Sequence, residues 1–360
     1  MTTWRYLAQR ALTGQWLDWD LPVARDELTW ALSGPGSLRG TLPPDYGRPL
    51  GVDGRPVLDE WATFLYAEAD GIIRWGGILT GCTFDNASWH LDAAGFSTYP
   101  TGLPYLDAYR QTGVDPAQVI RDIWRHIQAQ PDGNLGITVD ALTTPVRLGT
   151  TAEPFDLAWW EAPDCGQTID TLAKQTPLDY VEEHTWSGPS TVAHRIRLGY
   201  PRLGRRRTDL AFIQGDNIIT TVAAALDGSL IANEGIGIGK GEGRATLMRR
   251  IPTRDGRLRR ALTYTDKTVN TTSMLDSLVR RELAAHADPL TVDTIEIINH
   301  PHAPIGSWQL GDDILVQADV PGLGPISTWS RVVGWSLTGA DRAVLTLKPS
   351  SSFTYGAVPS

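Results

Sequence analysis

The chain has 360 residues, of which 41% are hydrophobic and 20% charged, with a formal net charge of −9. These values are ordinary for a globular protein, and the length predicts two to three domains. No apolar run approaches the roughly 20 residues that span a bilayer, so we expect no stable membrane insertion. The N-terminus also lacks the apolar core of a secretion signal. An acidic chain is a poor general nucleic-acid binder, because phosphate contacts need a basic surface.

Alternating strand patterns dominate the first hundred residues. Residues 17–21 and 28–32 both read Leu-x-Trp-x-Leu, which gives each strand one apolar face, and the short segment between them predicts a hairpin. The segment 34–49 is rich in Gly and Pro and predicts a loop. Residues 61–67 and 72–84 predict a further hairpin whose turn ends in glycine.

Helical patterns then interrupt the strands. Asp115 followed by Pro predicts a helix start, with apolar side chains at helical spacing as far as Ile127. Asp164 precedes a second helical segment, and a third begins at Ser273. We therefore expect α-rich segments inserted between β-segments.

One strand pattern occurs near both ends of the chain. Residues 65–95 read strand, turn, strand, turn, strand, and residues 315–349 repeat this order. With Trp75 placed over Trp329, the two stretches align without a gap as far as Leu91, which lies over Leu345. Only the Trp pair and the Leu pair are identical in this alignment. Two similar β-modules per chain would give three subunits six similar modules, which can dock on a six-fold partner. If the modules are duplicates, both indoles should pack in equivalent places against their cores.

Charge is unevenly placed along the chain. Residues 195–260 hold 14 Lys and Arg against 6 Asp and Glu, which is a net charge of +8. Because the whole chain has a net charge of −9, all other residues together carry −17. This arginine-rich stretch predicts a solvated face or a subunit contact. Contact with an acidic partner or with DNA is the alternative.

The sequence offers no persuasive active site, so we expect no enzyme activity and no catalytic, cofactor-binding or metal-binding residues. The Gly-rich run 233–243 fails the phosphate-loop pattern, because Gly241 follows Lys240 where Ser or Thr should bind magnesium. It predicts a strand connection or a close backbone approach. His300 and His302 are the only close histidine pair, but nearby cysteines and a zinc-type helical spacing are absent.

Fourteen tryptophans leave another class of function open, a carbohydrate- or cell-wall-binding module for host adsorption. Several of them fall among alternating strand residues, where core packing is the default: Trp19, Trp30, Trp75 and Trp329. A further alternative is a glycoside hydrolase with two carboxylates about 5 to 10 Å apart. Nothing in the sequence locates such a pair.

Several motifs resemble the tail-hub proteins of long-tailed phages, also called minor tail or baseplate-hub proteins. The C-terminal order is a helix at LDSLVRRELAAHADP, then TVDTIEIIN, WQLGDDILVQADVP and TWSRVVGWSLTGADRAVLTLKPS. The Gly-rich ANEGIGIGKGEGRATL and the N-terminal WLDWDLP and RWGGILTG resemble minor tail proteins of phages infecting actinobacteria.

The resemblance implies a mainly β fold with α+β insertions, in which two pseudo-equivalent β-barrel-like hub domains carry inserted helical or mixed domains. The first barrel-like domain would be 1–100, and an inserted α-rich domain 101–190. A mixed β segment with the Gly-rich loop, 191–270, would partly complete the first barrel or form an inserted domain. A helix and the second barrel-like domain would occupy 271–350, before a loose tail at 351–360.

The implied function is structural. Hub proteins of this kind form a homotrimeric, pseudo-six-fold ring at the tail tip of a siphophage virion, after synthesis in the host cytoplasm. The ring continues the tail-tube channel, joins the distal tail ring to the tip and takes part in DNA ejection. Implied partners are the chain itself, the distal tail protein or tail-tube ring, the tape-measure protein and downstream tip or receptor-binding proteins. DNA would pass without specific binding, because an acidic lumen repels phosphate. The chain looks like a hub without a lysin domain.

Overall fold

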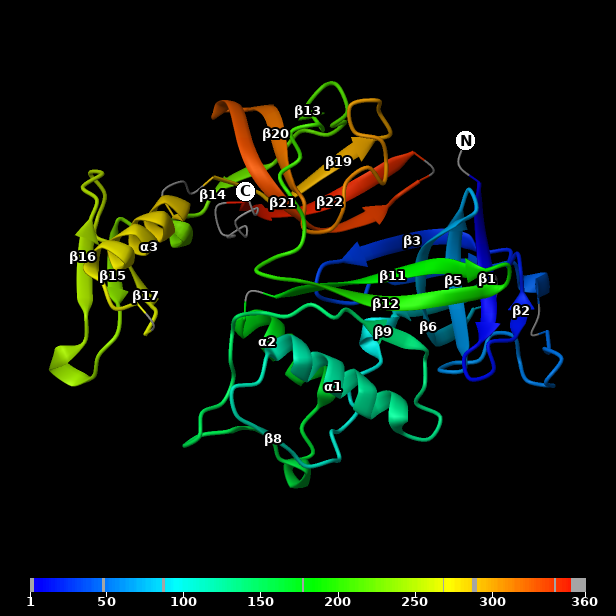
Figure 1. The fold of residues 1–360 in the computed structure, drawn as a ribbon. Helices are drawn as coiled ribbons and strands as arrows, with labels where there is room; N and C mark the ends of the chain where they lie inside the picture. The colour runs from blue at the N-terminus through cyan, green and yellow to red at the C-terminus, as the bar shows by residue number, and fades with distance from the viewer. Residues whose placement is uncertain are drawn as a thin grey trace.

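The structure, a computed structural model, describes residues 3–350 except 47–48, 86–87, 177, 268, 287–289 and 340. Strands outnumber helices in all parts of it, so the predicted mainly β class with α+β insertions is confirmed (Figure 1). The expected loose tail, 351–360, lies outside the described residues. No helix in the described part of the chain is long and apolar enough to cross a membrane.

One long sheet runs through the molecule. Its N-terminal strands are β1 (Trp4–Arg10), β2 (Trp16–Asp18), β3 (Ala24–Ala31), β4 (Ser37–Leu42), β5 (Thr63–Ala69), β6 (Ile72–Phe84) and β7 (Trp89–Gly95). Its C-terminal strands are β13 (Phe212–Ile213), β19 (Thr294–Ile298), β20 (Asp313–Val320), β21 (Gly324–Leu337) and β22 (Arg342–Pro349). The order is β2-β1-β5-β6-β7-β4-β3-β21-β20-β13, while β22 pairs with β21 and β19. Both predicted β-modules therefore belong to one sheet, joined where β3 pairs with β21.

The two stretches with the repeated pattern form the same meander. β5–β6–β7 and β20–β21–β22 are each three antiparallel strands in chain order around a long middle strand. The middle strands carry bulges at nearly the same place, between Leu79 and Gly81 in β6 and between Val332 and Gly334 in β21. A bulge adds one residue to one strand and bends it. The repeat predicted from the pattern is thus confirmed in strand order and direction, and the bulges add a likeness that the sequence pattern did not predict.

Two predictions for the N-terminal segment are wrong. β2 pairs with β1, whereas β3 pairs with β4 and β21, so residues 17–21 and 28–32 form no hairpin with each other. The predicted loop 34–49 contains β4, an internal strand of the sheet. A Cβ on Gly40 of this strand would lie 2.6 Å from Val23 Cγ1. Glycine here permits close packing on a strand, although in the sequence it looks like a turn residue.

The elements between β7 and β13 lie between two stretches of the long sheet; they are called the inserted unit here and cover one face of the N-terminal strands (Figure 1). Both predicted helix starts are confirmed, because the Asp115 carboxylate accepts a hydrogen bond from the Ala117 amide and the Asp164 carboxylate one from the Gln167 amide. β11 and β12 form one hairpin that crosses the expected boundary at 190/191. The elements are β8 (Tyr109–Gln111), α1 (Pro116–Ala129), β9 (Ile137–Val139), β10 (Phe155–Leu157), α2 (Cys165–Gln175), β11 (Asp179–Gly188) and β12 (Thr191–Gly199).

A small unit projects from the rest of the molecule (Figure 1). Its neck is the antiparallel pair β14 (Ala224–Leu226) and β18 (Leu290–Val292). Its body is a sheet of β15 (Glu234–Ile238), β16 (Met248–Pro252) and β17 (Ala261–Thr265), covered by the predicted third helix, α3 (Thr272–Ala285). β15 is part of the Gly-rich run, and Cβ atoms on Gly235 and Gly237 would lie 2.3 and 2.7 Å from Val279 of α3. The predicted close backbone approach is confirmed.

Three hydrophobic cores hold these parts together. The first joins both meanders, since Leu65 and Trp75 belong to the same cluster as Val316 and Leu345. The second lies on the other face of β5, where Tyr66 packs with the apolar face of α1. Neighbouring residues of a strand point to opposite faces, so β5 is covered on both sides. The third core belongs to the projecting unit alone.

Candidate assembly sites

Stacked tryptophans join the second meander to β3, the strand that connects it to the N-terminal part of the sheet. Trp30 of β3 lies opposite Trp335 of β21, and their rings stack with centroids 3.9 Å and planes 5° apart. The Trp30 Nε1–H donates to the carbonyl of Arg74 at 2.8 Å, and Trp308 packs edge-on against Trp335 at 5.7 Å. Such aromatic pairs add about 0.5–1.5 kcal/mol beyond the area they bury. The stack therefore stabilises the pairing on which the continuous sheet depends.

An aromatic cavity of about 220 Å³ lies beside this stack. Trp4, Trp30, Trp308 and Trp335 line it together with Arg74. Trp308 is only 2% exposed, and among the described residues its Nε1–H has no hydrogen-bond partner.

A buried ion pair fastens the inserted unit to the second meander. Arg331 of β21 is fully buried, and its Nη2 donates to Oδ2 of Asp179, at the start of β11, over 2.5 Å. The same guanidinium donates to the carbonyls of Gly311 and Leu203 at 3.0 and 2.8 Å. Removing one partner of a buried pair costs about 3–5 kcal/mol, because the other charge stays buried without compensation. Arg331 thus connects three segments that are distant in sequence.

The segment that links the inserted unit to the second meander adds further ion pairs. Arg206 Nε lies 3.1 Å from Asp313, and Arg207 lies 2.8 Å from Asp209 and 3.0 Å from Asp312. The hydrogen bond from Arg207 lowers the pKa of Asp209 to about 2, and the same bond raises the pKa of Arg207. The pair of Arg207 and Asp209 therefore stays ionised at neutral pH, and the ion pairs together orient the linker.

The arginines of the stretch 195–260 form ion pairs mainly within the chain. Most of its arginines lie within 4 Å of a carboxylate of this same chain: Arg195, Arg197, Arg202, Arg206, Arg207, Arg249, Arg250, Arg257 and Arg259. Glu234, which is buried, takes two of them, Arg250 and Arg259. The stretch is therefore less available to DNA than its composition suggests.

A buried polar chain links the first meander to the β11–β12 hairpin. His184 Nδ1 lies 3.1 Å from His194 Nδ1, and His194 Nε2 lies 3.2 Å from the Tyr66 hydroxyl. Tyr66 donates to Oε1 of Gln9 at 2.9 Å, and Nε2 of Gln9 donates to the carbonyl of Gly14 at 2.8 Å. The chain joins β1, β5, β11 and β12 through side chains that are all buried.

The donors and acceptors of this chain fix one arrangement of protons. Because the Gln9 oxygen accepts from Tyr66, the Tyr66 oxygen must accept from Nε2–H of His194. The bare Nδ1 of His194 then accepts from Nδ1–H of His184. Burial, and next the nearby His184, lower the pKa of His194 to about 3, so His194 is neutral at neutral pH.

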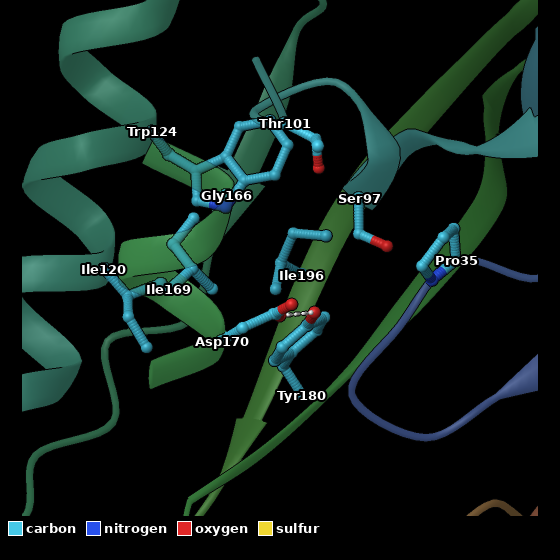
Figure 2. A pocket seen from close by; sticks show the side chains of 10 residues that line it. All are labelled: Pro35, Ser97, Thr101, Ile120, Trp124, Gly166, Ile169, Asp170, Tyr180 and Ile196. Atoms are coloured by element: carbon cyan, nitrogen blue, oxygen red, sulfur yellow. Dashed lines mark hydrogen bonds between the residues drawn. The ribbon is translucent and has the colours of Figure 1, made fainter. Parts of the chain in front are cut away.

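Figure 2 shows a cavity between α1, α2 and the β11–β12 hairpin. On one side Tyr180 donates to Oδ1 of Asp170 at 3.0 Å, and burial raises the pKa of Tyr180. On another side Ser97 has a buried hydroxyl that lacks a partner among the described residues. The volume of the cavity, about 40 Å³, admits water molecules but is far below the roughly 300–1,000 Å³ of a ligand pocket. By size this is a gap in the packing of the helices on the hairpin.

The structure brings the close histidine pair together with a third residue. His300 and His302 lie in the loop between β19 and β20, and Asp216, in the loop after β13, lies beside both. Sequence reasoning missed Asp216 because it lies 86 residues from His302 and no local spacing connects them. It also missed Arg331 and Asp179, for which a charged residue within the long strand β21 was the available signal.

Comparison with known proteins gives the fold a context. No protein-family model matches the sequence, and no curated protein matches it. A 43 kDa tail protein of prophage MuSo2 from Shewanella oneidensis is 12% identical, with a TM-score of 0.56 over 97% of this chain and 99% of that one. The prophage tail protein gp18 from Listeria monocytogenes is 13% identical, with a TM-score of 0.57 over 96% and 95%.

A third solved structure agrees with these two. A tail protein from Neisseria meningitidis is 16% identical, with a TM-score of 0.55 over 96% of this chain and 97% of that one. At such identities the likeness concerns the fold alone. The chain therefore has a fold found in phage tail proteins, and the likeness extends over nearly its whole length.

Proposed function

We propose that the chain is a structural, non-enzymatic protein of a phage tail, and specifically the tail hub of a long-tailed phage that infects actinobacteria. Three copies form a pseudo-six-fold ring at the tail tip. The ring continues the tail-tube channel and joins the distal tail ring to the tip proteins. DNA passes through the ring during ejection.

The duplicated meander is the observation that carries this proposal. β5–β6–β7 and β20–β21–β22 share strand order and direction, have bulges at nearly the same position, and lie in one continuous sheet. Three chains then supply six similar meanders, which is what a three-fold ring needs to contact a six-fold tube. The three tail proteins of similar fold support a role in the tail.

The domain organisation belongs to the same proposal. The hub domains are the barrel-like segments 1–100 and, within 271–350, the part that follows α3, and 101–190 is an insertion; the first half of the expected segment 271–350 differs, because α3 packs on β15–β17 in the projecting unit. Within 191–270 the strands serve different parts, since β12 pairs with β11, β13 with β20, and β15 to β17 form the projecting unit. We propose that this projecting unit is the inserted domain of that segment.

Charge supports a passive conduit for DNA. The chain carries −9 overall, and the arginines of 195–260 are largely paired with its own carboxylates. A lumen that repels phosphate lets DNA slide without being retained. The proposed partners are the distal tail protein or tail-tube ring, the tape-measure protein and downstream tip or receptor-binding proteins.

Mass and shape test the proposal. Light scattering across a concentration series should reach three times the chain mass of 39.4 kDa. Electron-microscopy averages of that species should show a ring with six similar densities around a channel. A single-chain mass throughout the series would overturn the trimer. Failure to find the chain in purified virions by mass spectrometry would overturn the tail role itself.

Carbohydrate binding is a second candidate, favoured by exposed aromatic rings. Trp19 is 42% exposed and stacks on Trp16 at 4.4 Å, and Trp159 and Trp160 are 52% and 66% exposed. Such rings are platforms for sugar faces. Binding of purified cell wall that is lost in Trp160→Ala, with the trimer intact, would establish this role beside the structural one.

A further inference from the structure

Three potential metal ligands converge at the edge of the second meander. Asp216 Oδ1 lies 3.3 Å from His300 Nε2, and Asp216 Oδ2 lies 2.9 Å from His302 Nδ1. One ligand atom from each of the three residues can be chosen so that all lie within 4.8 Å of one another. The side chains of His300, Asp216 and His302 are 25%, 35% and 58% exposed, so an ion can enter from solvent.

The separations fit a tetrahedral ion. Zinc binds imidazole nitrogen at about 2.0–2.1 Å and carboxylate oxygen at about 2.0–2.2 Å, so two ligands at a tetrahedral angle lie roughly 3.3 Å apart. Both Asp216–His distances lie near this value, but they run to different oxygens, Oδ1 toward His300 and Oδ2 toward His302. An ion would therefore bind both oxygens, or one of them after a small rotation of the carboxylate, and rotation of the exposed His302 ring can close the third edge. We propose that Asp216, His300 and His302 bind a divalent metal ion of the zinc class, with solvent in the remaining position.

The loops that carry these ligands are already held in place. The Asp216 and Asn217 amides both donate to the carbonyl of Ile213, at 3.2 Å each, and the Ile298 amide donates to the carbonyl of Asn217 at 3.0 Å. The Ala303 amide donates to the carbonyl of His300 at 3.0 Å, which closes the turn between the two histidines. Binding therefore needs little ordering of the backbone, which lowers its entropic cost. The ion would cross-link the loop after β13 to the loop before β20.

Metal binding requires the ring protons of His300 and His302 each to move to the other nitrogen of the ring. The His302 amide donates to Nδ1 of His300 at 3.3 Å, so without metal the proton of His300 is on Nε2, facing Asp216. When Nε2 binds the ion, this proton moves to Nδ1 and the long amide contact opens. The proton on Nδ1 of His302 moves to its Nε2.

Titration calorimetry of the tag-free chain with ZnCl₂ tests the site. We expect one ion per chain, a visible-range d–d spectrum of the tetrahedral type with CoCl₂, and no comparable binding of CaCl₂, because imidazole suits zinc-class ions. His302→Ala should weaken zinc binding at least tenfold. It should leave the circular dichroism spectrum unchanged, since this side chain is largely exposed.

His90 provides the matched control. Its Nε2 lies 3.0 Å from Asp85 in another exposed His–Asp pair, and no third ligand of this kind joins it within the described residues. His90→Ala should leave the zinc affinity unchanged. Equal affinities of wild type and His302→Ala, or loss of binding in His90→Ala alone, would overturn the proposal. So would a wild-type chain that shows no saturable zinc binding. All these measurements use the chain itself and do not depend on the proposed tail function.

Discussion

Trp75 of β6 and Trp329 of β21 lie at aligned positions in the middle strands of the two meanders, yet their surroundings differ. Trp75 is 3% exposed and belongs to the core shared by both meanders. Trp329 is only half-buried, and the Arg206 guanidinium lies 4.4 Å from its ring centre. The expectation that both indoles pack in equivalent places against their cores is therefore right for Trp75 and wrong for Trp329. The second module uses its tryptophan to hold the arginine linker.

This difference predicts unequal effects on stability. Trp75→Ala should lower the free energy of unfolding by about 3–5 kcal/mol, because it leaves a cavity in a closed core. Trp329→Ala should cost about 1–2 kcal/mol, since it removes partial burial and one cation–π contact. Urea unfolding followed by tryptophan fluorescence and circular dichroism measures both. Equal losses in the two variants would contradict the assignment of separate roles.

The buried ion pair of Arg331 and Asp179 predicts that replacing the Arg331 guanidinium strongly lowers the stability of the fold. Arg331→Met keeps most of the side-chain volume but leaves the Asp179 carboxylate buried beside fewer donors, and should cost about 3–5 kcal/mol. Arg39→Met is the control, because its pair with Glu27 at 3.3 Å is exposed and worth about 0–1 kcal/mol. Thermal unfolding of both variants decides the question. A loss at Arg331 no larger than at Arg39 would show that the buried pair is not needed.

How much of this fold the sequence predicts depends on the kind of signal. Helix starts were predictable because Asp115 and Asp164 cap their own helices, and the meanders because their strands alternate between turns. β1 was missed because the side chains on both of its faces are buried, so its sequence does not alternate between apolar and polar residues. β4 was missed because its Gly40 looks like a turn residue.

The sites were less predictable than the fold. Contacts such as His194 with Tyr66, or Asp216 with His302, join residues from distant segments, and only the folded chain brings them together. A single sequence shows the residue types but not their convergence. Local sequence patterns therefore predicted helices and strands, whereas the side-chain networks could be seen only in the tertiary structure.

The buried histidine chain predicts a dependence of stability on pH. His194 has an ordinary pKa near 6.5 when unfolded and one lowered to about 3 when folded, so between these values the unfolded state binds more protons. Its contribution is complete above pH 6.5 and is lost as pH falls toward 3, at a slope of up to about 1.4 kcal/mol per pH unit. Unfolding midpoints measured from pH 7 to pH 4 should fall less steeply in His194→Gln than in wild type. Parallel curves would contradict the assignment of this slope to His194.

The glycines of the projecting unit predict a local effect that global unfolding would miss. A Cβ on Gly235 would lie 2.3 Å from Val279 Cγ1, so Gly235→Ala forces β15 and α3 apart and should cost about 1–3 kcal/mol in that unit. Gly228→Ala is the matched control, because a Cβ there meets nothing within 4 Å and its backbone angle φ is not positive. Hydrogen exchange read out by mass spectrometry should show faster exchange in α3 for Gly235→Ala only, with the meanders unchanged, because the unit has its own core. Faster exchange throughout the molecule would mean that the projecting unit does not open independently, and unchanged exchange in α3 would mean that the helix is not seated on the glycines.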